Sequence, residues 1–177
     1  MQLKEVINKV IDILGLENEV NVNTPSTKLN KLISCANAIY SELIIEYVPL
    51  KTCEKITFSD GRAYYASFTK YVREVLTVKK GVSKYDFECY PLYVKSKAEG
   101  ECEVTYLYYP DELTIDSEIV LPPAFTSHVL AQGIVSEYYY RTGLVDEAVF
   151  YKTRYENSVN NVTKKRKSTC LPQRRFI

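Results

Sequence analysis

The sequence predicts an α+β fold in which helices flank a central antiparallel β region. Apolar residues recur every three to four positions in the first 47 residues and again between residues 123 and 163. Between these stretches the apolar period falls to two, and turn residues interrupt the chain repeatedly. We therefore expect an N-terminal helical pair, a β meander that closes as a small sandwich or barrel, a C-terminal helical hairpin and an extended basic tail.

The N-terminal pair is predicted from two amphipathic stripes. The first helix should run from Gln2 to Leu14, where Gly15 provides the stop. The second should open with Thr24 as its cap and Pro25 in its first turn, and should end before Pro49. The apolar stripes consist of Leu3, Val6, Ile7, Val10, Ile11 and Leu14 in the first helix, and Leu29, Leu32, Ile33, Ala36, Ile39, Tyr40, Leu43, Ile44 and Tyr47 in the second.

The β region begins at Glu54. Ile56 and Phe58 alternate with polar residues, and Asp60-Gly61 is a typical hairpin turn. Further strands are expected over residues 62–68, 72–78, 85–89, 92–97 and 102–109. With the turns between them, these segments predict five or six short antiparallel strands.

The C-terminal hairpin is bounded by proline and glycine. Pro122 and Pro123 should open its first helix, Gly143 should end it, and a final helix should span residues 145–163. Gly133 lies in the middle of a helix, where glycine costs about 1 kcal/mol relative to alanine, so we expect a neighbouring helix to approach closely there. The expected boundaries are 1–53 for the helical pair, 54–120 for the β-rich insertion, 121–163 for the hairpin and 164–177 for the arm.

Charge is unevenly distributed along the chain. The last fourteen residues hold six of the 23 basic side chains and no acidic one, which leaves 17 basic against 22 acidic residues, about −5, in the remainder. Such an arm should seek a negative partner, either nucleic acid or the acidic body of a neighbouring copy, although a solvated tail that aids solubility is an alternative. The predicted contact residues of the arm are Lys164, Lys165, Arg166, Lys167, Arg174, Arg175, Phe176 and Ile177.

Tyrosine is unusually frequent, with 16 Tyr against 6 Phe and no Trp. Tyrosine is enriched in protein interfaces, although a Tyr-rich β core explains part of the excess. Three consecutive tyrosines at 138–140 cannot all point to one side of a helix, so at least one should face solvent or another subunit. The candidate subunit-interface residues are Tyr138, Tyr139, Tyr140, Tyr151, Arg154 and Tyr155.

Signals for chemistry are weak. Five scattered cysteines and the single His128 do not form a zinc pattern, and we expect buried free thiols. No nucleophile or orienting acid is evident beside His128, and the phosphate-binding and nucleophile-elbow motifs are absent from the sequence. Glu42 and Glu46 have the spacing to chelate a cation, but a solvated helix surface is the simpler interpretation. The N-terminus lacks the apolar core of a secretory signal. We predict a non-enzyme without cofactor, metal or membrane partner.

The C-terminal hairpin resembles the head-to-tail connector (adaptor) proteins of tailed bacteriophages. That family has a proline-led helix, a stretch of small residues followed by Glu-Tyr, a glycine-containing turn, and a helix with an Arg/Lys-x-Tyr near its middle. The layout of N-terminal helices, β-rich insertion and final helical pair is also similar to the tail-tube adaptors of short-tailed phages. The matching stretches are Leu121-Pro122-Pro123, residues 132–138, Gly143, Glu147-Ala148, and residues 151–156.

The resemblance implies a structural virion protein at the head-tail junction that assembles in the host cytoplasm. It implies a ring, usually of twelve copies, which binds the portal and downstream tail proteins. Viral DNA would cross the ring during ejection without sequence-specific binding, and the C-terminal arm would reach the portal or an adjacent subunit. A tail completion or stopper ring is an alternative, and a nucleic-acid-binding module that uses the basic arm is another. Salt would separate these classes, because phosphate contacts weaken steeply as salt rises.

Overall fold

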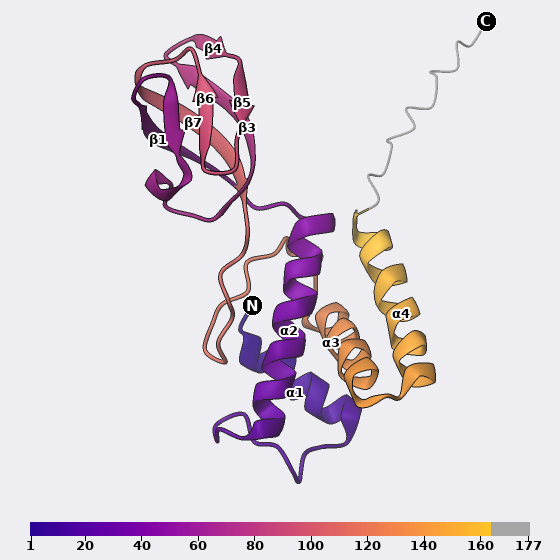
Figure 1. Cartoon of the computed structure of the whole chain (residues 1–177). Coiled ribbons are helices and arrows are strands. Elements are labelled where there is room, and N and C mark those ends of the chain that lie inside the picture. Colours follow the sequence, from indigo (N-terminus) through magenta and orange to yellow (C-terminus); the bar gives the residue numbers. More distant parts are fainter. Residues whose placement is uncertain (164–177) are drawn as a thin grey trace, which may run out of the picture.

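The computed structural model describes residues 1–163 and confirms the α+β class (Figure 1). Helical segments occupy both ends of this part of the chain, and antiparallel strands fill the middle. In chain order the elements are α1 (Leu3–Leu14), α2 (Thr27–Glu46), β1 (Lys51–Phe58), β2 (Arg62–Tyr64), the 3-10 turn η1 (Tyr65–Ser67), β3 (Val72–Lys80), β4 (Ser83–Tyr85), β5 (Phe87–Cys89), β6 (Tyr93–Ser96), β7 (Gly100–Tyr108), α3 (Ser127–Thr142) and α4 (Val145–Thr163).

The described residues form a helical body and a β module, each with its own hydrophobic core. Figure 1 shows the β module beyond the end of α2, joined to the body by the segment that enters β1 and the segment that leaves β7. The body core combines all four helices, whereas the module core draws on both of its sheets.

The centre of the helical body is α3, which packs against α1, α2 and α4. This position explains why its first ten residues are almost all buried, including the polar Gln132 and Ser136. Gly133 is the point of closest approach, as predicted. A Cβ atom there would lie 2.9 Å from Ile39 Cγ2 and 3.0 Å from the Tyr155 ring. The absence of a side chain therefore lets α2 and α4 close over α3.

Two helix starts differ from the prediction. The N-cap of α2 is Ser26, whose Oγ accepts a hydrogen bond from the Leu29 amide at 3.1 Å, so the helix begins after Pro25. The proline pair at 122–123 lies in a turn, and α3 starts only after its cap residue Thr126. The C-terminal stops were predicted correctly, because Gly15 and Gly143 adopt left-handed φ values of 66° and 83°.

The β module contains two antiparallel sheets, with strand orders β1-β7-β3-β4 and β2-β6-β5. This order is not a simple meander, because the first strand pairs with the last from Lys51↔Leu107 to Phe58↔Gly100. The expected strand 62–68 ends at Tyr64 and turns into η1, whereas residues 85–89 divide between β4 and β5. Both sheets contribute to one core, which makes a small sandwich.

The connection after β7 belongs to the helical body. Leu113 and Ile119 are buried in the body core, and the Asn37 side chain holds the Leu113 backbone by bonds of 2.7 and 3.0 Å. Nearby, the Leu3 amide donates to the Ser117 carbonyl at 3.0 Å. The β module therefore extends over residues 51–108, rather than 54–120 as the sequence suggested.

Candidate subunit interface

The basic arm predicted to contact a partner lies outside the described residues, and the other candidate interface residues all lie on the C-terminal hairpin. Four of its aromatic and basic side chains form one continuous row. The rings of Tyr139 and Tyr151 stack at 5.8 Å, and Phe150 meets Tyr151 edge to face at 5.3 Å. The Arg154 guanidinium lies 5.5 Å from the centre of the Phe150 ring. The row joins the end of α3 to the first half of α4.

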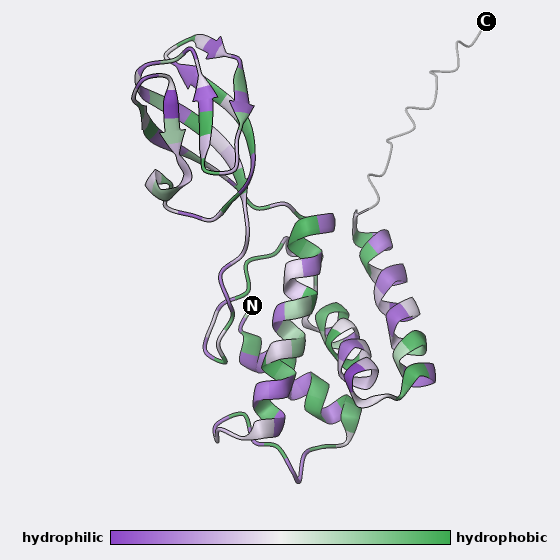
Figure 2. Ribbon diagram, viewed as in Figure 1, coloured by the Kyte–Doolittle hydropathy of each residue, from purple (hydrophilic) through white to green (hydrophobic). Residues whose placement is uncertain are grey.

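An apolar surface surrounds the turn between α3 and α4. Tyr140 is 68% exposed, Val149 58% and Phe150 56%, although an amphipathic helix needs only one apolar face for its own core. Figure 2 shows this hydrophobic character in the first turns of α4. Contiguous exposed apolar side chains mark interaction sites. We define the hairpin patch as Tyr140, Leu144, Val145, Val149 and Phe150.

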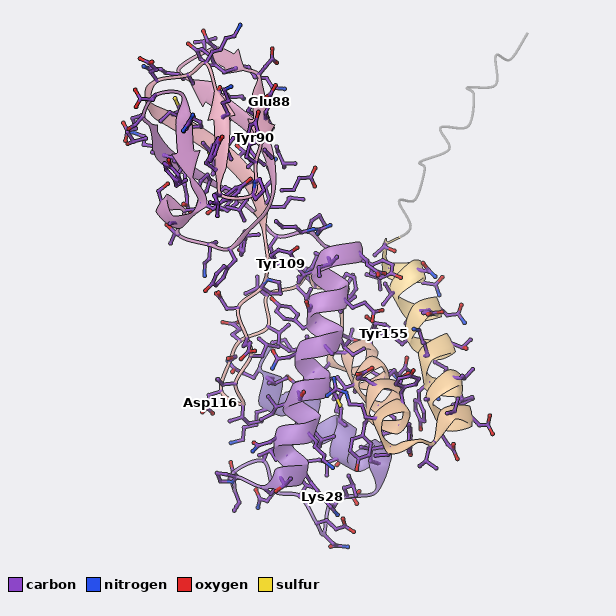
Figure 3. All side chains as sticks on the ribbon, viewed as in Figure 1. Lys28, Glu88, Tyr90, Tyr109, Asp116 and Tyr155 are labelled. Atoms are coloured by element: carbon purple, nitrogen blue, oxygen red, sulfur yellow. The ribbon has the colours of Figure 1, made fainter. Side chains whose placement is uncertain are left out.

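The candidate tyrosines take different positions. Tyr140 faces solvent, as the spread of three consecutive helical residues requires. Tyr138, Tyr139 and Tyr151 are half-buried against the body core, and Arg154 is exposed. Tyr155, the last of the predicted interface candidates, is only 2% exposed in the single chain (Figure 3). It lies four residues from both Tyr151 and Val159, on the inner side of α4.

Of the hairpin patch, the sequence predicted only Tyr140 and missed Leu144, Val145, Val149 and Phe150. The inner stripe is already complete with Ala148, Tyr155 and Val159. Val145, Val149 and Phe150 do not belong to this buried stripe. This surplus of apolar residues in the first turns of α4 is the sequence feature that could have predicted the patch.

Beside this hairpin, α2 and α4 present carboxylates to one another. Burial raises the pKa of Glu42, Lys152 opposes the rise, and the carboxylates of Glu46, Glu156 and Glu137 reinforce it. The Tyr155 hydroxyl is buried in the same region and has no hydrogen-bond partner within residues 1–163. Tyr155 and Glu42 both line a cavity of about 30 Å³. These groups give α2 and α4 an excess of negative charge beside an unsatisfied polar atom.

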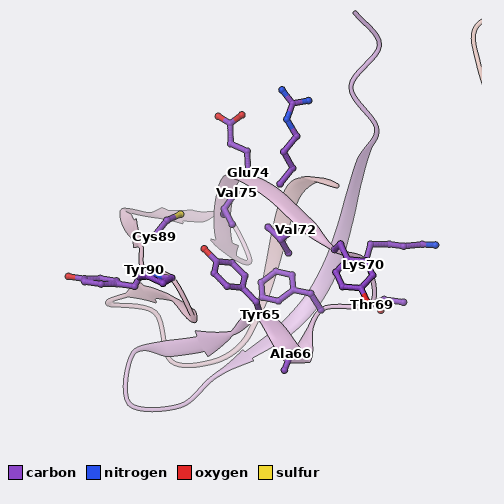
Figure 4. Close-up of a pocket in the computed structure, with 13 residues that line it drawn as sticks. Tyr65, Ala66, Thr69, Lys70, Val72, Glu74, Val75, Cys89 and Tyr90 are labelled. Atoms are coloured by element: carbon purple, nitrogen blue, oxygen red, sulfur yellow. The ribbon is translucent and has the colours of Figure 1, made fainter. Parts of the chain in front are cut away.

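The β module carries a larger groove of about 790 Å³ (Figure 4). Its walls include Tyr65, Phe68, Tyr71 and Tyr90, with the Cys89 thiol at one end. Burial raises the pKa of Tyr65 to about 12, and the nearby Cys89 thiol adds to the rise, so this phenol stays protonated at neutral pH. The groove therefore combines aromatic walls with the charged side chains of Lys70, Arg73 and Glu74.

The free thiols were only partly predicted correctly. Cys35 and Cys102 are buried, but Cys53 and Cys89 are exposed because they occupy solvent-facing positions of β1 and β5. Burial raises the pKa of Cys35 to about 11 against the effect of Arg141. The two classes of thiol should thus differ strongly in reactivity.

His128 is exposed on α3, and its Nε2 lies 2.8 Å from Nε2 of Gln132. Within residues 1–163, histidine, cysteine and carboxylate side chains do not gather in a group of three suited to a metal ion. Over the same residues, the helices are too short or too polar to cross a bilayer.

Comparison of the chain with models of known protein families and with curated proteins gave no match. The surfaces described above, together with the resemblance of the hairpin sequence, are therefore the basis for a functional assignment.

Proposed function

We propose that this chain is a structural virion protein that forms a ring between the portal and the tail of a tailed bacteriophage, as a head-to-tail connector through which DNA passes. The observation that supports the proposal best is the hairpin patch. It occupies the segment whose sequence resembles the connector family, and it leaves Val149 and Phe150 more than half exposed beside a complete core.

A ring needs two different contact surfaces on each copy. Heterologous contacts join one surface of a subunit to another surface of the next, and the chain of contacts closes when the rotation allows. The β module supplies further exposed apolar side chains, among which Tyr71 is 82% and Leu92 72% exposed. It is separated from the hairpin patch by the length of the helical body (Figure 1). This arrangement suits head-to-tail contact better than a symmetric dimer.

The charge distribution suits a conduit. Residues outside the arm carry about −5, since 17 basic side chains oppose 22 acidic ones. An acidic lumen would not hold DNA phosphates, so viral DNA could pass without sequence-specific binding. In this proposal the arm binds protein, either the portal or an adjacent copy. A tail completion or stopper ring would use the same surfaces.

The second candidate, a nucleic-acid-binding module, is favoured by one observation, the six basic residues of the arm. Its binding to DNA should weaken by orders of magnitude as salt rises, whereas apolar ring contacts should persist.

The first test measures the mass of the purified protein by light scattering, alone and with its cognate portal. The paired substitutions Val149→Ser and Phe150→Ser should weaken assembly by about tenfold or more, because aromatic anchors at interfaces typically contribute 2 kcal/mol or above. The matched control is Asn160→Ser with Asn161→Ser, which changes two exposed residues of the same helix. Deletion of residues 164–177 tests the role of the arm. A monomer that ignores the portal and retards DNA in a salt-sensitive way would overturn the proposal.

A further inference from the structure

The groove between α2 and α4 holds an acidic patch, which we define as Glu42 and Glu46 of α2 together with Glu156 of α4. The two helices meet over Gly133, where Ile39 and Tyr155 close on the missing side chain. Glu46 and Glu156 are exposed, whereas Glu42 is half-buried at the entrance to the small cavity. The patch is therefore accessible from solvent and leads inward.

Basic side chains within residues 1–163 balance this patch only in part. Lys152 lines the cavity and lies 3.9 Å from Glu156, so among the cavity-lining residues a single cation faces the three carboxylates of the patch. Glu137 is already paired with Arg141 at 2.7 Å. Glu42 and Glu46 form no ion pair in the described part of the chain, and like charges at such spacing on a helix repel. The patch thus has room for at least one further cation.

The Tyr155 hydroxyl gives an independent sign of a missing partner. It is buried at the cavity that Glu42 also lines, and it lacks a hydrogen-bond partner among the described residues. A buried polar group without a partner typically costs about 1–3 kcal/mol. The cavity of about 30 Å³ has room for one water molecule or one ammonium group. An ammonium there would donate to the Tyr155 oxygen and neutralise Glu42.

We propose that this site receives the basic run Lys164–Lys167 of a second copy of the chain. The run supplies four consecutive cations, three of them lysines, and follows directly after α4. Its charge complements the patch, and lysine has the compact ammonium head that the cavity admits. The inference rests on the proposed ring, because it names the surface of one subunit that the arm of another would bind.

The direction of α4 favours a second copy over the chain's own arm. Glu156 precedes Thr163 by seven residues, or roughly 10 Å along the helix axis, so the run would have to reverse at once to reach its own patch. Residues 164–167 contain no glycine, proline, asparagine, aspartate or serine, the residues that reverse a chain in tight turns.

The test uses a fluorescent peptide of residues 164–177 and the full-length chain. The arm of the full-length chain is made acidic by Lys164→Glu, Lys165→Glu, Arg166→Glu and Lys167→Glu. This arm-reversed variant cannot occupy the patch with its own arm, so the patch is free to bind the peptide. Binding is followed by anisotropy at dilute protein and about 0.15 M salt, where charges further apart than roughly 8 Å are screened. We expect Glu42→Lys with Glu46→Lys to weaken binding by about tenfold or more, which corresponds to 1.4 kcal/mol.

The control changes net charge equally at a distant site. Glu101→Lys with Glu103→Lys alters two exposed carboxylates of β7 and should change the affinity by less than about twofold if attraction is local. The milder pair Glu42→Gln with Glu46→Gln should give an intermediate loss, which guards against misfolding of the lysine variant. Equal losses at both sites, or no binding, would overturn the inference.

The unmodified chain separates the two possible sources of the arm. At dilute protein, the unmodified chain should bind the peptide as tightly as the arm-reversed variant does. Much weaker binding by the unmodified chain would mean that the chain's own arm fills its patch. The peptide assay does not require ring assembly, so it tests the arm contact separately from the proposed ring. Peptide binding without ring formation would overturn the proposed function alone, and a ring whose arm ignores the patch would overturn this inference alone.

Discussion

Gly133→Ala tests the packing that holds the C-terminal hairpin on the body. In an exposed helix this change would stabilise the chain by about 1 kcal/mol, because alanine has the higher helix propensity. Here the new Cβ would lie 2.9 Å from Ile39 Cγ2 and 3.0 Å from two carbons of the Tyr155 ring. Both neighbours are buried, at 5% and 2% exposure, so neither can move without disturbing the core. Overpacking of this kind typically costs about 1–3 kcal/mol.

The two effects oppose one another, and the clash should win. We expect the free energy of unfolding to fall by up to about 2 kcal/mol, measured by urea denaturation followed by circular dichroism at 25 °C. As a control, Asn160→Ala at an exposed site of α4 should raise stability by up to about 0.7 kcal/mol. A gain of about 1 kcal/mol from Gly133→Ala would refute the close approach.

A double-mutant cycle identifies the neighbour responsible. Ile39→Ala should cost about 2–5 kcal/mol by itself, because it empties a buried site. In that background the added methyl group of Gly133→Ala gains space on one side, so its cost should shrink by about 0.5 kcal/mol or more. Strict additivity of the two changes would assign the clash to Tyr155 alone.

Three further predictions concern how the polar and thiol side chains are buried. Tyr155→Phe should raise the free energy of unfolding by about 1 kcal/mol, because it removes a buried hydroxyl without a partner, and a loss of stability would mean that an internal water satisfies it. Burial raises the pKa of Glu42, so the folded chain holds this proton more tightly than the unfolded one and loses stability as pH rises from about 4 through the raised pKa. Glu42→Gln lacks this loss, so its stability advantage in urea titrations should be small near pH 4 and larger at pH 7, and an advantage that is constant with pH would contradict the assignment. In a Cys170→Ser chain, a thiol reagent should modify the exposed Cys53 and Cys89 rapidly in the folded state. The buried Cys35 and Cys102 should react only after unfolding.

The sequence was sufficient where structure is determined locally. Gly15 and Gly143 end their helices because glycine accepts the left-handed conformation that a C-terminal cap requires. The start of α2 was less clear, since Thr24 and Ser26 are both good caps and Pro25 suits a first turn. The hydrogen bond from the Leu29 amide to Ser26 Oγ decides between them.

Strand order could not be predicted in the same way. The pairing of β1 with β7 joins segments at opposite ends of the β module, and the alternation of apolar residues within a strand does not specify its partner. The interface residues divide similarly. Exposure of at least one tyrosine among residues 138–140 follows from helical geometry alone, whereas burial of Tyr155 depends on how α2 and α4 close over Gly133.

Features that weaken the isolated chain are concentrated on α4 and on the part of α2 that faces it. They include exposed Val149 and Phe150, the unbalanced Glu42 and Glu46, and the Tyr155 hydroxyl. Each feature is unfavourable for a different physical reason. The exposed Val149 and Phe150 leave apolar surface in water, the carboxylates of Glu42 and Glu46 repel one another, and the Tyr155 hydroxyl lacks a hydrogen-bond partner among the described residues. Sequences are locally consistent with their fold except at functional sites, so a cluster of such exceptions indicates a site.

Each of these costs is also of a kind that a protein partner removes. Apolar side chains would be buried, a cation would neutralise the carboxylates, and an ammonium would satisfy the Tyr155 oxygen. A nucleic acid would not neutralise the carboxylates, because its phosphates repel the acidic patch. The surfaces that make the single chain less stable are therefore of a kind that protein–protein contacts bury, as the proposed ring requires.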